Sequence, residues 1–226
     1  SWFAQADPVQ QMRCYAALAV ASGDKTWEDK AFTILSELIQ SQTLPRAVAS
    51  AAAEAGDLPG AVRVEACARV DFGGGWTDTP PYSIEQGGTV LNGAISLRGA
   101  FPIVVEAERL DEPRLVLHGR DIDTVSQPVV VGDVQSYTDL SDPFALLKAA
   151  LVLRGLVPAT AAPQTPLATV MSKMGGLRLS THTAIPRGSG LGTSSILAGA
   201  VLACLARFQG RPLSEQELFD EVLCLE

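Results

Sequence analysis

The chain has 226 residues, of which 47% are hydrophobic and 19% are charged, and its formal net charge is −8. This length and composition predict a folded core the size of one large domain, with room for a smaller additional segment. The negative charge argues against a nucleic-acid surface, and no apolar run reaches the roughly 18 residues that span a bilayer. We therefore expect neither nucleic acid nor a membrane among the partners.

The cysteines carry no metal-binding or disulfide pattern. Four are present, none in C-x-x-C spacing, and the chain has only two histidines. Isolated cysteines in apolar surroundings are typical of buried, reduced thiols. The prediction is a cytoplasmic protein without disulfides or a zinc site.

The first 57 residues predict helices. Residues 9–21 and 45–55 are rich in alanine, and residues 27–39 place large apolar side chains on one face. A run of glycine and proline at 56–60 is a plausible boundary. Because residues 1–57 contain no chemical motif, we interpret them as a helical appendage or linker.

Beyond residue 60 the hydrophobic pattern changes to that of strands. Residues 62–70 alternate between apolar and polar side chains, as in a half-buried strand. Further strands are expected at 89–95, 100–107, 114–118, 129–131 and 177–184. A helix is expected over about 143–156, and Ser214 with Glu217 fits the capping box of a final helix. Together these elements predict an α+β fold with a mixed or antiparallel sheet.

A glycine-rich loop precedes an apolar helix within residues 186–207. Its alternate glycines and the hydroxyl side chains after them are Gly188, Gly190, Gly192, Thr193, Ser194 and Ser195. Glycines let the backbone approach a ligand, and a helix N-terminus offers free N–H groups and partial positive charge to a phosphate. The loop lacks the lysine of the common P-loop. We favour a phosphate cradle of another lineage over a glycine-rich turn with a hydroxyl cap.

A second glycine-rich loop follows the expected strand at 62–70. Three glycines at 73–75 precede Trp76 and Asp78. Asp78 can accept hydrogen bonds from sugar hydroxyls, while Arg69 on the strand can offset charge on a phosphate or an ionising hydroxyl. The alternative is a tight turn in which Asp78 satisfies backbone amides.

Together the two loops resemble the motifs of a known family, the GHMP superfamily of sugar kinases. The first motif is similar to Arg-Val-Asp-Phe-Gly-Gly-Gly-Trp-Thr-Asp-Thr-Pro-Pro-Tyr at 69–82, and the phosphate-binding motif to Pro-Arg-Gly-Ser-Gly-Leu-Gly-Thr-Ser-Ser at 186–195. This pair of motifs most resembles L-fucokinases, including bifunctional enzymes whose kinase follows a GDP-fucose pyrophosphorylase part. Kinases of heptose phosphates share a related Gly-Gly-Gly-Thr-Asp form. The resemblance covers residues 61–226.

The resemblance implies a two-lobed α+β kinase that uses ATP, Mg²⁺ and a small-molecule sugar. Residues 61–226 would form its ribosomal-protein-S5-domain-2-like N-terminal lobe, preceded by the helical segment 1–57, and the C-terminal lobe would be absent. The triphosphate would bind Gly188, Ser189, Gly190, Leu191, Gly192, Thr193, Ser194 and Ser195. The sugar would face Gly74, Gly75, Trp76, Thr77 and Asp78. Arg69 and Asp78 would serve catalysis, and Ser194 and Glu226 would hold Mg²⁺.

The leading prediction is phosphorylation of the anomeric hydroxyl of L-fucose to give fucose 1-phosphate. A kinase of a heptose phosphate or another sugar is one alternative, and a non-catalytic nucleotide- or sugar-binding module is another. A phosphorylated substrate needs basic residues near the sugar loop, and only Arg63 and Arg98 are close in sequence.

The chain ends at Glu226, before the position at which the family carries the aspartate that polarises the sugar hydroxyl. We therefore expect an incomplete fragment that is inactive or nearly so alone. Apolar surface left by the missing lobe would favour self-association.

Overall fold

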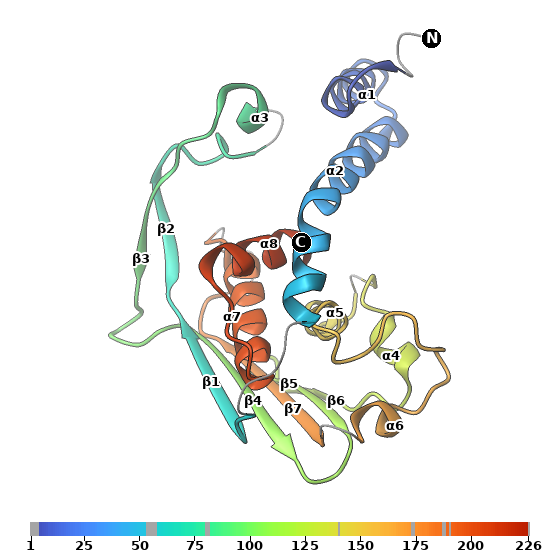
Figure 1. Cartoon of the computed structure of the whole chain (residues 1–226). Coiled ribbons are helices and arrows are strands. Elements are labelled where there is room, and N and C mark those ends of the chain that lie inside the picture. Colours follow the sequence, from blue (N-terminus) through green and yellow to red (C-terminus); the bar gives the residue numbers. More distant parts are fainter. Residues whose placement is uncertain are drawn as a thin grey trace.

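The computed structural model describes residues 5–52, 58–79, 82–139, 141–172, 175–186, 189 and 191–225. The helices are α1 (Pro8–Ser22), α2 (Lys25–Ala52), α3 (Tyr82–Gln86), α4 (Val131–Gln135), α5 (Ala145–Leu153), α6 (Leu167–Met171), α7 (Thr193–Phe208) and α8 (Glu215–Leu225). The strands are β1 (Ala61–Ala66), β2 (Ala68–Gly73), β3 (Leu91–Ile95), β4 (Ile103–Leu110), β5 (Leu115–Gly119), β6 (Thr124–Ser126) and β7 (Gly176–Thr183). Figure 1 shows a main sheet with α7 across it, an arm formed by β2 and β3, and α2 running past α8. No helix in the described ranges combines the length and apolar character needed to cross a membrane.

The main sheet is mixed, as predicted, with strand order β1-β4-β7-β5-β6. β5 and β7 run parallel, and the other neighbouring pairs are antiparallel. Val105, Leu117 and Leu179 lie on three adjacent strands and are fully buried. Their shared face therefore forms the floor of the hydrophobic core.

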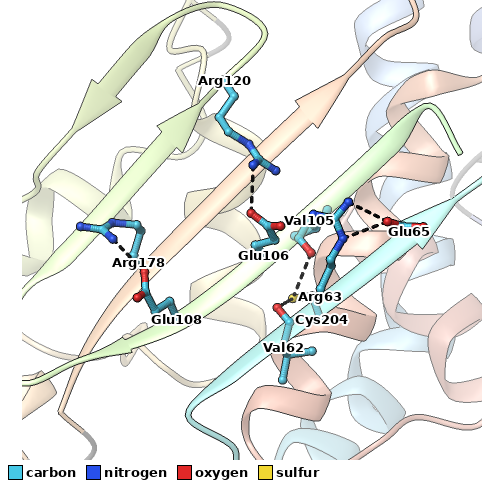
Figure 2. A network of polar contacts seen from close by, with 9 residues as sticks. All are labelled: Val62, Arg63, Glu65, Val105, Glu106, Glu108, Arg120, Arg178 and Cys204. Carbon is cyan, nitrogen blue, oxygen red and sulfur yellow. Dashed lines mark hydrogen bonds and ion pairs between the residues drawn. The ribbon is translucent and has the colours of Figure 1, made fainter. Parts of the chain in front are cut away.

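Helix α7 packs on this face across β1 and β4. Val201, Leu205 and Phe208 of the helix are fully buried, and each side chain of this size contributes about 1.5–3 kcal/mol through burial. The Sγ of Cys204 lies 3.7 Å from the carbonyl oxygen of Val62 and 3.8 Å from that of Val105 (Figure 2). Burial raises the pKa of Cys204 to about 12. Helix α7, which begins within the predicted phosphate-binding motif at residues 186–195 (the phosphate loop), is thus fixed directly to the sheet.

The opposite face of the sheet is lined by charged side chains (Figure 2). Ion pairs join Arg63 to Glu65 and Glu106, Arg120 to Glu106, and Arg178 to Glu108. Because these groups are partly exposed, each pair contributes only about 0–1 kcal/mol. This charged face is therefore suited to contact with solvent and not to burial in a hydrophobic core.

A buried ion pair joins the helices behind α7. The Nη1 of Arg154, just after α5, lies 2.5 Å from an oxygen of Glu221 on α8, and both side chains are fully buried. The Nε of Arg154 also donates to Gln209, whose side chain donates back to the carbonyl of Arg154 at 3.0 Å. These additional hydrogen bonds offset part of the cost of removing both charges from water.

The N-terminal segment is helical, as predicted, but two helices expected at 27–39 and 45–55 are one helix through Pro45. Proline removes one backbone hydrogen bond. Packing against α8, with Thr43 and Ala47 buried, compensates for that loss. Tertiary contacts therefore override the local signal to end the helix.

Two strand predictions were wrong. The expected strand at 62–70 is divided at Cys67 into β1 and β2, which belong to different sheets. The strand expected at 129–131 is a single bridge beside α4, where a carboxylate oxygen of Asp133 accepts the N–H groups of Val129 and Val130. By contrast the capping box of α8 is confirmed, because Ser214 and Glu217 exchange backbone and side-chain hydrogen bonds.

Candidate active site

The glycine-rich loop at residues 73–78 lies at the end of the arm. β2 and β3 pair in antiparallel register, with a bulge between Asp71 and Gly73, and extend away from the main sheet (Figure 1). Phe72 and Leu91 of the arm are 69% and 67% exposed. The arm therefore presents apolar side chains and the loop that follows β2 to its surroundings.

Two glycines allow the segments of this loop to touch. A Cβ placed on Gly74 would lie 2.0 Å from the carbonyl oxygen of Thr89, and one on Gly88 would lie 2.4 Å from that of Thr77. The hydroxyl of Thr77 donates to Gly74 at 2.6 Å and accepts the N–H of Thr89 at 3.0 Å. The glycines and the Thr77 hydroxyl thus determine the shape of the loop.

Trp76 and Asp78 face outward from this framework. Trp76 is 84% exposed and has a φ of 74°, an uncommon conformation for a residue with a Cβ. The N–H of Thr79 closes the turn on the carbonyl of Trp76 at 3.2 Å, and Asp78 is exposed. The indole of Trp76 and the carboxylate of Asp78, two residues apart, are therefore both accessible to a ligand such as a sugar.

The two glycine-rich motifs meet at the base of the arm. Arg69 is held by Asp71, with Nε–Oδ1 and Nη2–Oδ2 distances of 3.1 and 3.2 Å. A Cβ placed on Gly192 of the phosphate loop would lie 3.4 Å from Nη2 of Arg69. The guanidinium group therefore lies against the phosphate loop, and a Cβ at position 192 would be in van der Waals contact with it.

Asp71 is a part of this site that the sequence reasoning missed. It is two residues from Arg69 on the same strand, and residues at that spacing share one face. That spacing was the available signal. It predicts a side-by-side pair, but not that the pair lies at the phosphate loop.

The start of α7 fits a phosphate group. Gly192 adopts a left-handed φ of 63° immediately before the helix, so the backbone turns sharply there. The Oγ1 of Thr193 is buried and makes no hydrogen bond with a described residue. A buried hydroxyl without a partner costs about 1–3 kcal/mol, which a phosphate oxygen at the helix N-terminus would relieve. Ser194 and Ser195 are exposed beside it.

Three predicted site residues, Gly188, Gly190 and Glu226, lie outside the described residues. Of the rest, the structure brings Arg69 together with Gly192 near the first turn of α7, where Thr193 and Ser194 lie. Gly74 and Thr77 lie together at the far end of the arm. The roles assigned to these residues in binding and catalysis stay predictions.

Comparison with known proteins agrees with this geometry. Residues 159–226 match the family model described as GHMP kinases N terminal domain. The chain is 39% identical over 160 residues to the L-fucokinase/L-fucose-1-P guanylyltransferase of Bacteroides fragilis, covering 70% of this chain and 17% of that protein. It is 37% identical over 171 residues to the bifunctional fucokinase/GDP-fucose pyrophosphorylase of Arabidopsis thaliana, covering 74% and 15% respectively. The chain thus spans about one sixth of the length of these relatives.

The fold is similar to that of a solved D-glycero-D-manno-heptose 1-phosphate kinase from Bacteroides thetaiotaomicron. The TM-score is 0.54 at 22% identity, covering 73% of this chain and 47% of the other. Residues 159–226 therefore match a GHMP kinase N-terminal domain, and the chain has a mixed α+β fold similar to that of such a kinase, as the two motifs predicted.

Proposed function

We propose that this chain is the nucleotide-binding lobe of a sugar kinase that transfers the γ-phosphate of ATP to the anomeric hydroxyl of L-fucose. The observation that carries the proposal is the contact between the two motifs, in which Arg69 lies against Gly192. The two fucokinase relatives support L-fucose as the acceptor.

In this proposal the residues of the phosphate loop bind the triphosphate. The N–H groups of Gly192 and of the first turn of α7 donate to its oxygens, and the Thr193 hydroxyl gains a partner that the described residues do not supply. Ser194 and Glu226 hold Mg²⁺, which supplies charge neutralisation for phosphoryl transfer when bound. Both residues remain assigned by resemblance.

In this proposal Arg69 acts at the phosphoryl group that is transferred. Asp71 fixes the plane of its guanidinium through two contacts, which leaves Nη1 for the transferred group or the sugar oxygen. Preorganised positive charge at that point stabilises the charge that develops during transfer. Trp76 and Asp78 would contact the sugar, and Gly74, Gly75 and Thr77 would shape the loop that carries them.

The surroundings of the basic residues favour a neutral sugar over a heptose phosphate. Arg63 lies on the charged face of the sheet and is paired with Glu65 and Glu106. Arg98 lies in the turn between β3 and β4, where Leu97 and Ala100 bond to each other. Neither position supports recognition of a second phosphate beside Asp78.

The exposed apolar side chains on the arm are relevant to whether the chain associates with itself. Phe72, Tyr82 and Leu91 are each more than half exposed. Exposed apolar surface favours association. We propose that the chain associates with a second copy and that its catalytic activity alone is absent or low.

The first test measures binding of a non-hydrolysable ATP analogue with Mg²⁺ by isothermal titration calorimetry. The wild-type chain should bind, and Arg69→Gln should weaken binding by about tenfold because a charged hydrogen bond to phosphate is lost. Arg178→Gln is the matched control, because Arg178 lies on the charged outer face. Absence of nucleotide binding, or equal effects of the two substitutions, would contradict the proposal.

Release of ADP from Mg²⁺-ATP with L-fucose, D-mannose or a heptose phosphate tests the acceptor. Stimulation by L-fucose alone would support L-fucose as the acceptor and would contradict the proposed low activity of the chain alone. Stimulation by the heptose phosphate alone would replace the fucose assignment. Light scattering on the same samples reports whether the chain associates with itself.

A further inference from the structure

A groove of about 1350 Å³ lies between α2, α5 and α8. Its walls are largely apolar, with Ile39 on α2, Leu146 and Val152 on α5, and Leu223 on α8. Ligand sites of this kind combine apolar walls with a few polar groups that orient the ligand. Ser36 and Gln40 of α2 supply such groups on one wall.

The groove is continuous with the phosphate loop. Ser194, in the first turn of α7, lines it together with residues of α2 and α5. A ligand whose phosphates lie at the N-terminus of α7 would therefore place the rest of its structure at this groove. An apolar cleft next to a phosphate site suits the flat ring and ribose of a nucleotide.

Helix α2 is held firmly enough to form a wall. Thr43, on the side that packs toward α8, is 5% exposed, and Ala47 is 1% exposed. On the groove side, the amide of Gln40 donates to the hydroxyl of Ser36 at 3.3 Å. This pair offers both donors and acceptors on an apolar surface, and such groups can pair with the edge of a base.

We propose that α2 forms one wall of the subsite for the nucleoside of the bound nucleotide, with Gln40 and Ser36 contacting it. The inference rests on the proposed nucleotide-binding function. It makes the N-terminal helical segment part of the ligand site, in place of the appendage that its lack of a motif suggested.

The test fills the groove from α2 and compares two probes on the full chain. Gln40→Trp puts a bulky side chain into the groove, whereas Gln42→Trp puts the same side chain on an exposed position outside it. The probes are a non-hydrolysable ATP analogue and inorganic tripolyphosphate, both with Mg²⁺, measured by calorimetry. Gln40→Trp should weaken the analogue by about tenfold or more and leave tripolyphosphate within about twofold, because only the nucleoside is displaced. Gln42→Trp should leave both unchanged.

A second pair guards against a variant that fails to fold. Ser36→Trp lies in the groove and Ser41→Trp lies on an exposed position outside it. Unchanged analogue binding in Gln40→Trp and Ser36→Trp, or parallel loss of tripolyphosphate binding, overturns the inference while the phosphate site stands. A wild-type chain that binds neither probe overturns the proposed function and this inference together.

Discussion

The main sheet and the arm are built in opposite ways. Leu205 of α7 is fully buried against the sheet, whereas Leu91 of the arm is 67% exposed. A two-stranded ribbon by itself is at best marginally stable in water, whereas a sheet that packs against helices is stable. Core packing therefore positions the phosphate loop. Local hydrogen bonds and the Arg69–Asp71 ion pair position the loop that is proposed to face the sugar.

The sharpest test of this contrast compares two leucines. Leu205→Ala should lower the free energy of unfolding by about 2–5 kcal/mol, because it leaves a cavity in the core. Leu91→Ala should change it by no more than about 0.5 kcal/mol, as exposed positions do. Urea unfolding of both variants measures the difference. Similar losses for the two would show that the arm is packed in solution.

A smaller effect is expected at the end of the arm. Thr77→Val removes the hydroxyl that joins Gly74 to Thr89 and should cost about 1 kcal/mol locally. Amide hydrogen exchange at Thr89 should accelerate about fivefold, with the urea midpoint unchanged. Thr79→Val, an exposed threonine two residues along the same loop, is the control. Acceleration spread across the main sheet would contradict an independent arm.

The smallest expected effect is a loss of folding stability at low pH through Glu217 of α8. Hydrogen bonds from the hydroxyl and N–H of Ser214 hold the pKa of Glu217 below its ordinary value of 4.5. The unfolded chain therefore binds this proton more readily, so the stabilisation is complete above pH 4.5 and is lost as the pH falls through the lowered pKa. Loss of such a cap costs up to about 1 kcal/mol. Urea unfolding at several pH values should show wild type and Glu217→Gln converging as the pH falls. A constant difference would contradict a role for the ionised carboxylate.

The sequence predicted the α+β class, most element positions and the capping box of α8, because these depend on local periodicity and spacing. It did not predict that α2 continues through Pro45 or that the strand divides at Cys67, because packing against distant residues decides both. For the site, glycine spacing indicated both loops. The contact between Arg69 and Gly192 depends on how the arm leaves the sheet, and no short-range pattern encodes that.

Because the strand divides at Cys67, any rotation of the arm relative to the main sheet would be centred beside the core. Ala68, the first residue of β2, is fully buried, so this end cannot shift sideways. β2 extends about 17 Å from there to Gly73, so a rotation of about 5° would carry Gly73 through about 1.5 Å and Arg69 through only about 0.3 Å. A rotation of this size would therefore move the loop at residues 73–78 while leaving Arg69 nearly in place beside Gly192.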